Sequence, residues 1–286
     1  PTAGGQNELG LGAIVVLPDD NDDGLADSVL KFIDNLPQTQ GLVFANGHLY
    51  FQDATSLKRV PFKAGDRTPS GTPETVAAMR DSDAQQFPYH WPKVVDVAKD
   101  GSVYFTNGSV QEEACYSPGE RTKHPPAGVV FKVAGDGSLR VVAQGFRNPI
   151  AIRCEQMFNV CLLVELAKDG SGSTGGREKI VPIRQGDDWG FPCCATKMKP
   201  YDAQTFQDPT GEMAGRLLQD SDCAGVAAEN VSLKIGDTPF GIDFEGGSWE
   251  APWQNRAFVA MHGAVGTLIG SRVVALGLDM MTGLPL

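Results

Sequence analysis

Short runs of alternating apolar and polar residues, each introduced by a turn pair, recur along the chain. Asn46-Gly47 precedes HLYF at residues 48–51, and Asp100-Gly101 precedes SVYF at 102–105. Alternation with a period of two, directly after Asn-Gly or Asp-Gly, predicts β-hairpin strands. The same pattern predicts strands at 93–98, after the Asp136-Gly137 turn, and at 160–166 and 256–261.

The two related turns lie 54 residues apart, at Gly47 and Gly101. Repeats of roughly 40 to 55 residues with four short strands each are typical of β-propeller blades. We therefore predict an all-β fold, a six-bladed β-propeller of four-stranded antiparallel blades, as a single domain over residues 1–286. About five blades fit this length, so we expect the propeller to be incomplete at one or both ends. A β-sandwich is the alternative.

Composition supports this fold class and limits the partners. With 34 glycines and 19 prolines in 286 residues, few windows leave room for a helix of ten residues. A net charge of −11, without a cluster of Lys and Arg, argues against nucleic acid. No apolar run approaches the roughly 20 residues of a transmembrane helix. The start, PTAGGQNE, has no signal-peptide pattern, so we expect a signal to have been removed or the true start to be missing.

Six cysteines are present, and none forms a zinc-binding pattern. Disulfides are therefore expected, which favours an oxidising compartment and a secreted or periplasmic protein. Cys154 and Cys161 flank a predicted hairpin tip and are predicted to pair. The remaining four allow three pairings, one of which contains a bridge between adjacent cysteines: Cys115, Cys193, Cys194 and Cys223.

An acidic segment at residues 19–30 resembles the first part of an EF-hand calcium loop. Asp19, Asn21, Asp23 and Asp27 supply side-chain oxygens, and Gly24 stands at the bend. Leu30 occupies the twelfth position, so the usual bidentate carboxylate is missing. Two interpretations of this segment remain open: a weak calcium site and a solvated acidic turn.

Three further segments carry residues suited to chemistry. His90 lies between aromatic residues and prolines, directly before a predicted strand, and histidine is the usual general base near neutral pH. Arg147-Asn148 stands in GFRNP at 145–149, where a guanidinium and an amide can bind a carbonyl and stabilise an oxyanion. Residues 175–195, GGREKIVPIRQGDDWGFPCCA, form a glycine-rich loop that can direct backbone carbonyls at a hard cation.

These three segments, in this order, resemble the glucose/sorbosone dehydrogenase family of soluble quinoproteins. The resemblance implies pyrroloquinoline quinone (PQQ) and calcium as cofactors. It assigns catalysis to His90 and Arg147, and cofactor binding to Arg147, Asn148, Thr238 and His262. The backbone carbonyls of Gly190, Phe191 and Pro192 are implied as ligands of the cofactor calcium.

The family resemblance implies a PQQ-dependent oxidoreductase that oxidises a sugar, a sorbosone-like sugar aldehyde or a related alcohol, with a separate electron acceptor. Tyr89 and Trp91 stand where the family has other residues, which predicts a different substrate pocket. Two alternatives remain open. One is a non-catalytic propeller that binds a protein or glycan, and the other is a calcium-dependent hydrolase of the lactonase type.

Overall fold

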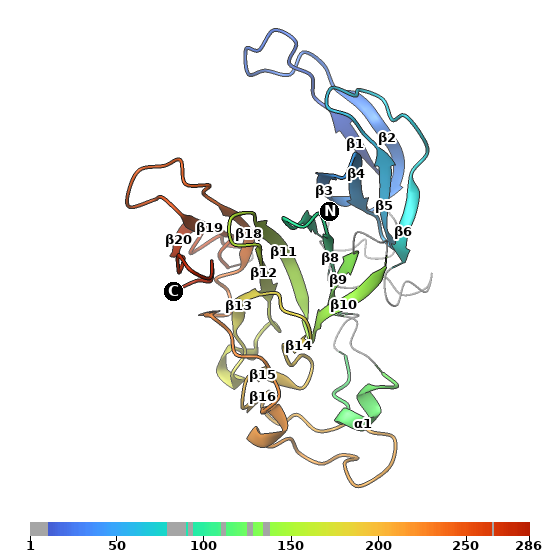
Figure 1. Cartoon of the computed structure of the whole chain (residues 1–286). Coiled ribbons are helices and arrows are strands. Elements are labelled where there is room, and N and C mark those ends of the chain that lie inside the picture. Colours follow the sequence, from blue (N-terminus) through green and yellow to red (C-terminus); the bar gives the residue numbers. More distant parts are fainter. Residues whose placement is uncertain are drawn as a thin grey trace. The chain divides into compact units, whose positions relative to one another are not determined.

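The computed structural model describes residues 11–78, 90, 94–109, 113–124, 128–133, 138–264 and 266–286 (Figure 1). The chain divides into two compact units, residues 1–87 and 88–286. The single propeller domain over residues 1–286 stays a prediction. The turn expected at Asp136-Gly137 lies outside the described residues.

The first unit consists of a hairpin and a four-stranded antiparallel sheet. Apolar side chains from both sheets share one core, which includes Ile14, Phe32 and Phe51. Asn46 and Gly47 both have positive φ, 51° and 71°, as the predicted tight turn requires. The strands are β1 (Leu11–Val16), β2 (Leu30–Pro37), β3 (Gln40–Ala45), β4 (His48–Gln52), β5 (Ser56–Pro61) and β6 (Glu74–Ala78).

The second unit contains three larger sheets, with strand orders β14-β10-β9-β8-β7, β11-β12-β13-β17 and β18-β19-β20. Their strands are β7 (Val95–Val97), β8 (Val103–Asn107), β9 (Val129–Val133), β10 (Leu139–Gln144), β11 (Asn148–Glu155), β12 (Val160–Leu166), β13 (Glu178–Pro182), β14 (Asp187–Asp188), β17 (Val231–Leu233), β18 (Pro239–Phe244), β19 (Arg256–Met261) and β20 (Arg272–Gly277). The described residues of this unit also form a small hairpin and three short helices: β15 (Cys194–Thr196), β16 (Lys199–Pro200), α1 (Pro118–Arg121), η1 (Ser171–Thr174) and η2 (Asp220–Cys223).

The β12 strand shows why the three sheets stack face to face. Its residues are buried on both faces, which accounts for the continuous apolar run VCLLV. Leu163 packs into the core shared with the β7–β10 sheet, whereas Leu162 and Val164 pack into the core shared with β18 and β19. Successive side chains of a strand point to opposite faces, so this sheet is the middle layer.

The predicted all-β class is confirmed. In the described part of the chain the only α-helix is the single turn α1. The predicted strands at 160–166 and 256–261 match β12 and β19, whereas the strand predicted at 93–98 is described only as β7, Val95–Val97. Among the described residues, no helix has the length and apolar character needed to cross a bilayer.

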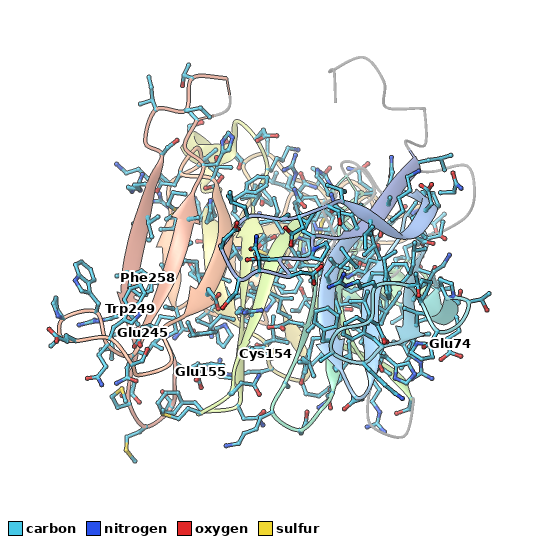
Figure 2. All side chains as sticks on the ribbon, turned by 90° about the horizontal axis from the view of Figure 1, so that it is seen from above. Glu74, Cys154, Glu155, Glu245, Trp249 and Phe258 are labelled. Atoms are coloured by element: carbon cyan, nitrogen blue, oxygen red, sulfur yellow. A yellow bond between two sulfur atoms is a disulfide. The ribbon has the colours of Figure 1, made fainter. Side chains whose placement is uncertain are left out.

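All six cysteines form disulfides. Cys154 pairs with Cys161 as predicted, across the first rungs of the β11–β12 hairpin. Cys154 and the neighbouring Glu155 are labelled in Figure 2. The other pairs are Cys115–Cys193 and Cys194–Cys223. Of the three open pairings, the structure therefore excludes the one with a bridge between adjacent cysteines.

The connection between β18 and β19 is fixed by one carboxylate. Glu245 accepts backbone N–H groups from Ser248, Trp249 and Asn255. Desolvation opposes ionisation of Glu245, but the backbone donors together outweigh it and lower its pKa to about 2. The Trp249 ring lies 5.3 Å from the Phe258 ring of β19 (Figure 2).

Candidate functional site

The residues predicted to bind a cofactor lie at strand ends on one edge of the second unit. We call this edge the site rim; it comprises the end of β8 and the starts of β11, β13 and β18. Hydrogen bonds join these strand ends across the sheets: the Ser109 N–H donates to the Arg147 oxygen, and the Thr238 N–H donates to Glu178 Oε2. Loop residues between sheets lie near one another there, as loops that carry binding sites on a rigid scaffold commonly do.

His90 is buried and sits against the end of β8. Its Nδ1 lies 3.0 Å from the Ser109 backbone oxygen and 2.8 Å from Ser109 Oγ. A proton on Nδ1, donated to the backbone oxygen, leaves the lone pair on Nε2, the tautomer that a general base needs. A Cβ added to Gly108 would lie 2.2 Å from the His90 backbone oxygen, so glycine at 108 permits this close approach.

Arg147 follows next along the site rim. Its backbone oxygen accepts the Ser109 N–H at 2.8 Å, so Ser109 connects His90 to Arg147. The guanidinium is largely buried and donates to the Ala167 oxygen at 2.7 Å and to Asp169 at 3.3 Å. These contacts place the predicted base next to the Arg147 backbone, while the guanidinium itself is directed to Ala167 and Asp169.

Asn148 carries a polar atom with no hydrogen-bond partner. The residue is 8% exposed, and its Oδ1 is fully buried without a partner among the described residues. Buried polar atoms are normally satisfied, and an unsatisfied one costs on the order of 1–3 kcal/mol. An orphaned amide oxygen at the site rim, beside a buried arginine, is what a site for a hydrogen-bonding ligand provides.

The GFRNP segment contacts the glycine-rich loop directly. The Gly145 oxygen accepts the Phe191 N–H at 2.9 Å, and the Gln144 oxygen accepts the Trp189 N–H at 2.8 Å. Gly145 has φ of 78°, and a Cβ there would lie 2.3 Å from Asp188 Oδ1. The structure therefore brings together all three segments predicted from the sequence.

Two of the three carbonyl oxygens predicted to bind calcium, those of Gly190 and Phe191, have hydrogen-bond partners within the fold. Gly190 O accepts the N–H groups of Cys193 and Cys194, and Phe191 O accepts a 3.2 Å hydrogen bond from Arg121. Arg121 also forms a 2.8 Å ion pair with Asp188. A calcium ion on the Gly190 or Phe191 carbonyl would share the oxygen with these hydrogen bonds or replace them. Calcium ligation by Gly190, Phe191 and Pro192 stays a prediction.

Thr238 and His262 lie at the far part of the site rim. The Thr238 oxygen accepts the His262 N–H at 2.8 Å, and the Thr238 N–H donates to Glu178 Oε2 at 2.6 Å. Thr238 has φ of 48°, a left-handed conformation that costs energy in a residue with a side chain. Glu178, from the Gly-Gly-x-Glu segment, therefore holds the strained loop in place.

Glu178 has a strongly perturbed carboxyl group. Burial raises its pKa to about 7, with help from the charges of Asp237 and Asp169, although the N–H groups of Thr238 and Gly236 stabilise the carboxylate. The folded pKa lies above the unfolded value, so folding favours the protonated form.

We expect the Glu178 carboxyl to make stability fall as the pH rises from about 4.5 to about 7. Below that window both states are protonated and the contribution is complete; above it the loss levels off at on the order of 3 kcal/mol. Urea unfolding at several pH values measures the slope. Glu178→Gln should remove it, whereas Glu120→Gln, at an exposed ion pair with Lys123, should keep it. An unchanged slope in Glu178→Gln would contradict this assignment.

A buried ion pair that the sequence reasoning missed lies beneath the site rim. Glu165 of β12 and Lys179 of β13 are paired in register, with side chains 2% and 3% exposed. Glu165 interrupts the apolar run VCLLVEL, and such an isolated charge predicts a buried group that needs a partner. Lys179 has no such signal, because it is the last of three consecutive charged residues that begin at Arg177.

The acidic segment at 19–27 belongs to the other compact unit. Its side chains cap the loop's own backbone: Asp19 accepts the N–H groups of Asp23 and Gly24, and Asp27 accepts that of Asp20. Asn21 and Asp23 are also hydrogen-bonded to each other. Across the described ranges, no group of three or more His, Cys, Asp or Glu side chains is placed to hold a metal. Calcium at Asp19, Asn21, Asp23 and Asp27 stays a prediction.

No protein-family model and no curated protein matches the sequence. Solved structures do match the fold. The calcium structure of a family AA12 carbohydrate-active enzyme from Trichoderma reesei superposes with a TM-score of 0.65 at 14% identity, over 96% of this chain and 74% of that one.

Two PQQ proteins are also similar. The holo form of the pyranose dehydrogenase PQQ domain from Coprinopsis cinerea gives a TM-score of 0.62 at 15% identity, over 95% of this chain and 71% of that one. The PQQ-bound aldose sugar dehydrogenase from Streptomyces coelicolor gives 0.55 at 14% identity, over 95% and 76%. At these identities the likeness is one of fold.

Proposed function

The chain has the fold of the soluble PQQ-dependent sugar dehydrogenases, and we propose that it is a PQQ- and calcium-dependent oxidoreductase of sugars. The observation that carries the proposal is the hydrogen-bonded sequence His90–Ser109–Arg147 at the site rim. It joins the His90 imidazole to the backbone carbonyl of Arg147, the residue whose side chain carries the buried guanidinium. Within this class, the substrate we propose is a sugar hemiacetal, a sorbosone-like aldehyde or a related alcohol.

The residues at the site rim fit a quinone cofactor. A polyanionic quinone needs cationic and hydrogen-bonding groups. The site offers the Arg147 guanidinium and the Asn148 amide, whose buried Oδ1 has no partner among the described residues and can accept a ring N–H. We propose that Arg147, Asn148, Thr238 and His262 hold it. The carbonyls of Gly190, Phe191 and Pro192 would hold its calcium, which takes oxygen ligands at flexible geometry.

PQQ, when bound, supplies the acceptor for the two electrons and the carbon-bound hydrogen of the substrate. The protein's own part is proton transfer and charge stabilisation. His90 Nε2 takes the proton of the substrate hydroxyl, while Nδ1–H, held by Ser109, keeps the ring in the required tautomer. Arg147 places a fixed positive charge where negative charge develops, in a buried position that screens it little.

Reconstitution tests the proposal. The purified chain is incubated with calcium and PQQ, binding is followed by the absorbance of the quinone, and sugar-dependent reduction of a dye is then measured. We expect binding that needs both components and turnover with aldose sugars. No binding of PQQ at any calcium concentration would refute the proposed function.

The finer features of the prediction belong to this proposal as well. We propose that the three- to five-stranded sheets are blades of a six-bladed propeller, and that a separate protein or small molecule accepts the electrons. Three disulfides support a secreted or periplasmic location, because such bonds persist in oxidising compartments.

A further inference from the structure

We propose that Glu165 and Lys179 are positioning residues that hold the Arg147-Asn148 segment and the Trp189–Pro192 loop in one fixed relation. The inference rests on the proposed function, because those two segments are the two halves of the proposed cofactor site. Neither residue is assigned a contact with the cofactor or with substrate.

The geometry links both segments through a single pair. Glu165 Oε1 accepts the backbone N–H of Arg147 at 2.8 Å. Lys179 Nζ lies 3.5 Å from Glu165 Oε2 and donates to the Trp189 backbone oxygen at 3.4 Å. Glu165 thus contacts Arg147, directly before Asn148, and Lys179 contacts Trp189, directly before Gly190.

The stability of the fold does not explain why charges stand at these positions. Burial raises the pKa of Glu165, with the Lys179 charge opposing the shift, so desolvation is the larger effect. Apolar pairs of similar volume often serve a core as well as a buried ion pair or better. What an apolar pair cannot supply is an acceptor for Arg147 N–H and a donor for Trp189 O.

The two contacts control the geometry at the reacting end. The position of the Arg147 backbone determines where the Arg147 and Asn148 side chains can reach. The position of the Trp189 backbone determines where the Gly190 and Phe191 carbonyls lie. A displacement of about 1 Å in a binding constellation can cost on the order of 100-fold in rate. Outer residues that orient ligands around a metal typically change affinity by about 10- to 100-fold when removed.

Adjacent residues of β13 act on opposite faces of the strand. Glu178 is directed to the Thr238 loop, and Lys179, the next residue, is directed to Glu165 and Trp189. Side chains alternate along a strand, so the start of β13 fixes loops on both sides. The pair proposed here is independent of the Glu178 contact, because the two share no partner atom.

The test compares Lys179→Met, Lys179→Arg and the double variant Glu165→Gln/Lys179→Met. Lys179→Met should raise the Kd for PQQ at saturating calcium by about 10- to 100-fold. Lys179→Arg keeps a cationic donor, so its Kd should lie between those of wild type and Lys179→Met. In the double variant, loss of the unpaired buried charge should recover stability, while the Kd stays raised because Trp189 O still has no donor. The matched control is Lys58→Met, which breaks the Lys58–Asp53 pair in the first unit and should leave the Kd unchanged.

Amide hydrogen exchange of the cofactor-free protein gives a second measurement that does not need PQQ. Lys179→Met should speed exchange in peptides covering residues 145–149 and 187–193, and Lys58→Met should not. If wild-type protein fails to bind PQQ, the proposed function falls while this exchange result still decides the positioning role. Unchanged exchange at both segments, or an equal loss of affinity in Lys58→Met, would overturn the inference.

Discussion

His90→Gln is expected to lower kcat for sugar oxidation by about 10²- to 10⁴-fold, the usual contribution of a positioned general base. Glutamine can still meet Ser109 with a polar group, so the fold and the binding of PQQ should persist. The loss should fall on kcat, because the imidazole is needed for proton transfer and is proposed to bind no cofactor atom. Single-turnover reduction of the bound quinone, followed spectroscopically, measures the step directly.

His124→Gln is the matched control for this experiment. His124 is exposed and stacks on Tyr116 at 4.4 Å between ring centroids. Its replacement should leave kcat unchanged. If His90→Gln binds PQQ and keeps kcat within about threefold of wild type, His90 is not the base.

Removal of the Cys115–Cys193 disulfide, by Cys115→Ser/Cys193→Ser, is expected to have the largest effect on stability. The bond closes a segment of 78 residues, and chain entropy assigns such a loop about 4.5 kcal/mol. It also ends one residue beyond Pro192, so calcium affinity in the presence of PQQ should weaken as well. Urea unfolding and calcium titration measure the two effects separately.

The hairpin disulfide supplies the control for position. Cys154–Cys161 spans seven residues, which corresponds to about 2.4 kcal/mol, and lies at the end of β11 away from Asn148. Cys154→Ser/Cys161→Ser should lower stability without changing calcium affinity. Equal losses of calcium affinity in both double variants would show that the Cys115–Cys193 bond has no special relation to the loop.

Local patterns in the sequence were sufficient to predict the strands. Asn46-Gly47 readily adopts positive φ at both positions, as a two-residue hairpin turn requires, and the strand after it follows from alternation. Val160–Leu166 was identifiable as a strand because an apolar run bounded by a turn has few other solutions. Cys154 and Cys161 paired as predicted because a hairpin brings them together whatever the rest of the fold does.

Contacts between distant segments could not be predicted in the same way. The pairing of Cys115 with Cys193 depends on where the loop after β8 meets the loop after β14, and no periodicity encodes that meeting. The same holds for Ser109, whose role arises only because the end of β8 lies beside Arg147. Glu165 was visible as a charge within an apolar run, whereas Lys179 ends a run of three charged residues, and each became informative only once the other was found opposite it.

Cys193 and Cys194 are adjacent, yet their bonds run in opposite directions along the chain, to Cys115 and to Cys223. A single proteolytic cut between residues 115 and 193, or between 194 and 223, therefore leaves both fragments covalently joined. The segment between residues 115 and 193 includes α1, the part of the site rim from Arg147 to Glu178, and the loop through Pro192. A nicked molecule would migrate as one species without reductant and as two with it, so a protein exposed to extracellular proteases can be cut here without shedding half of its site.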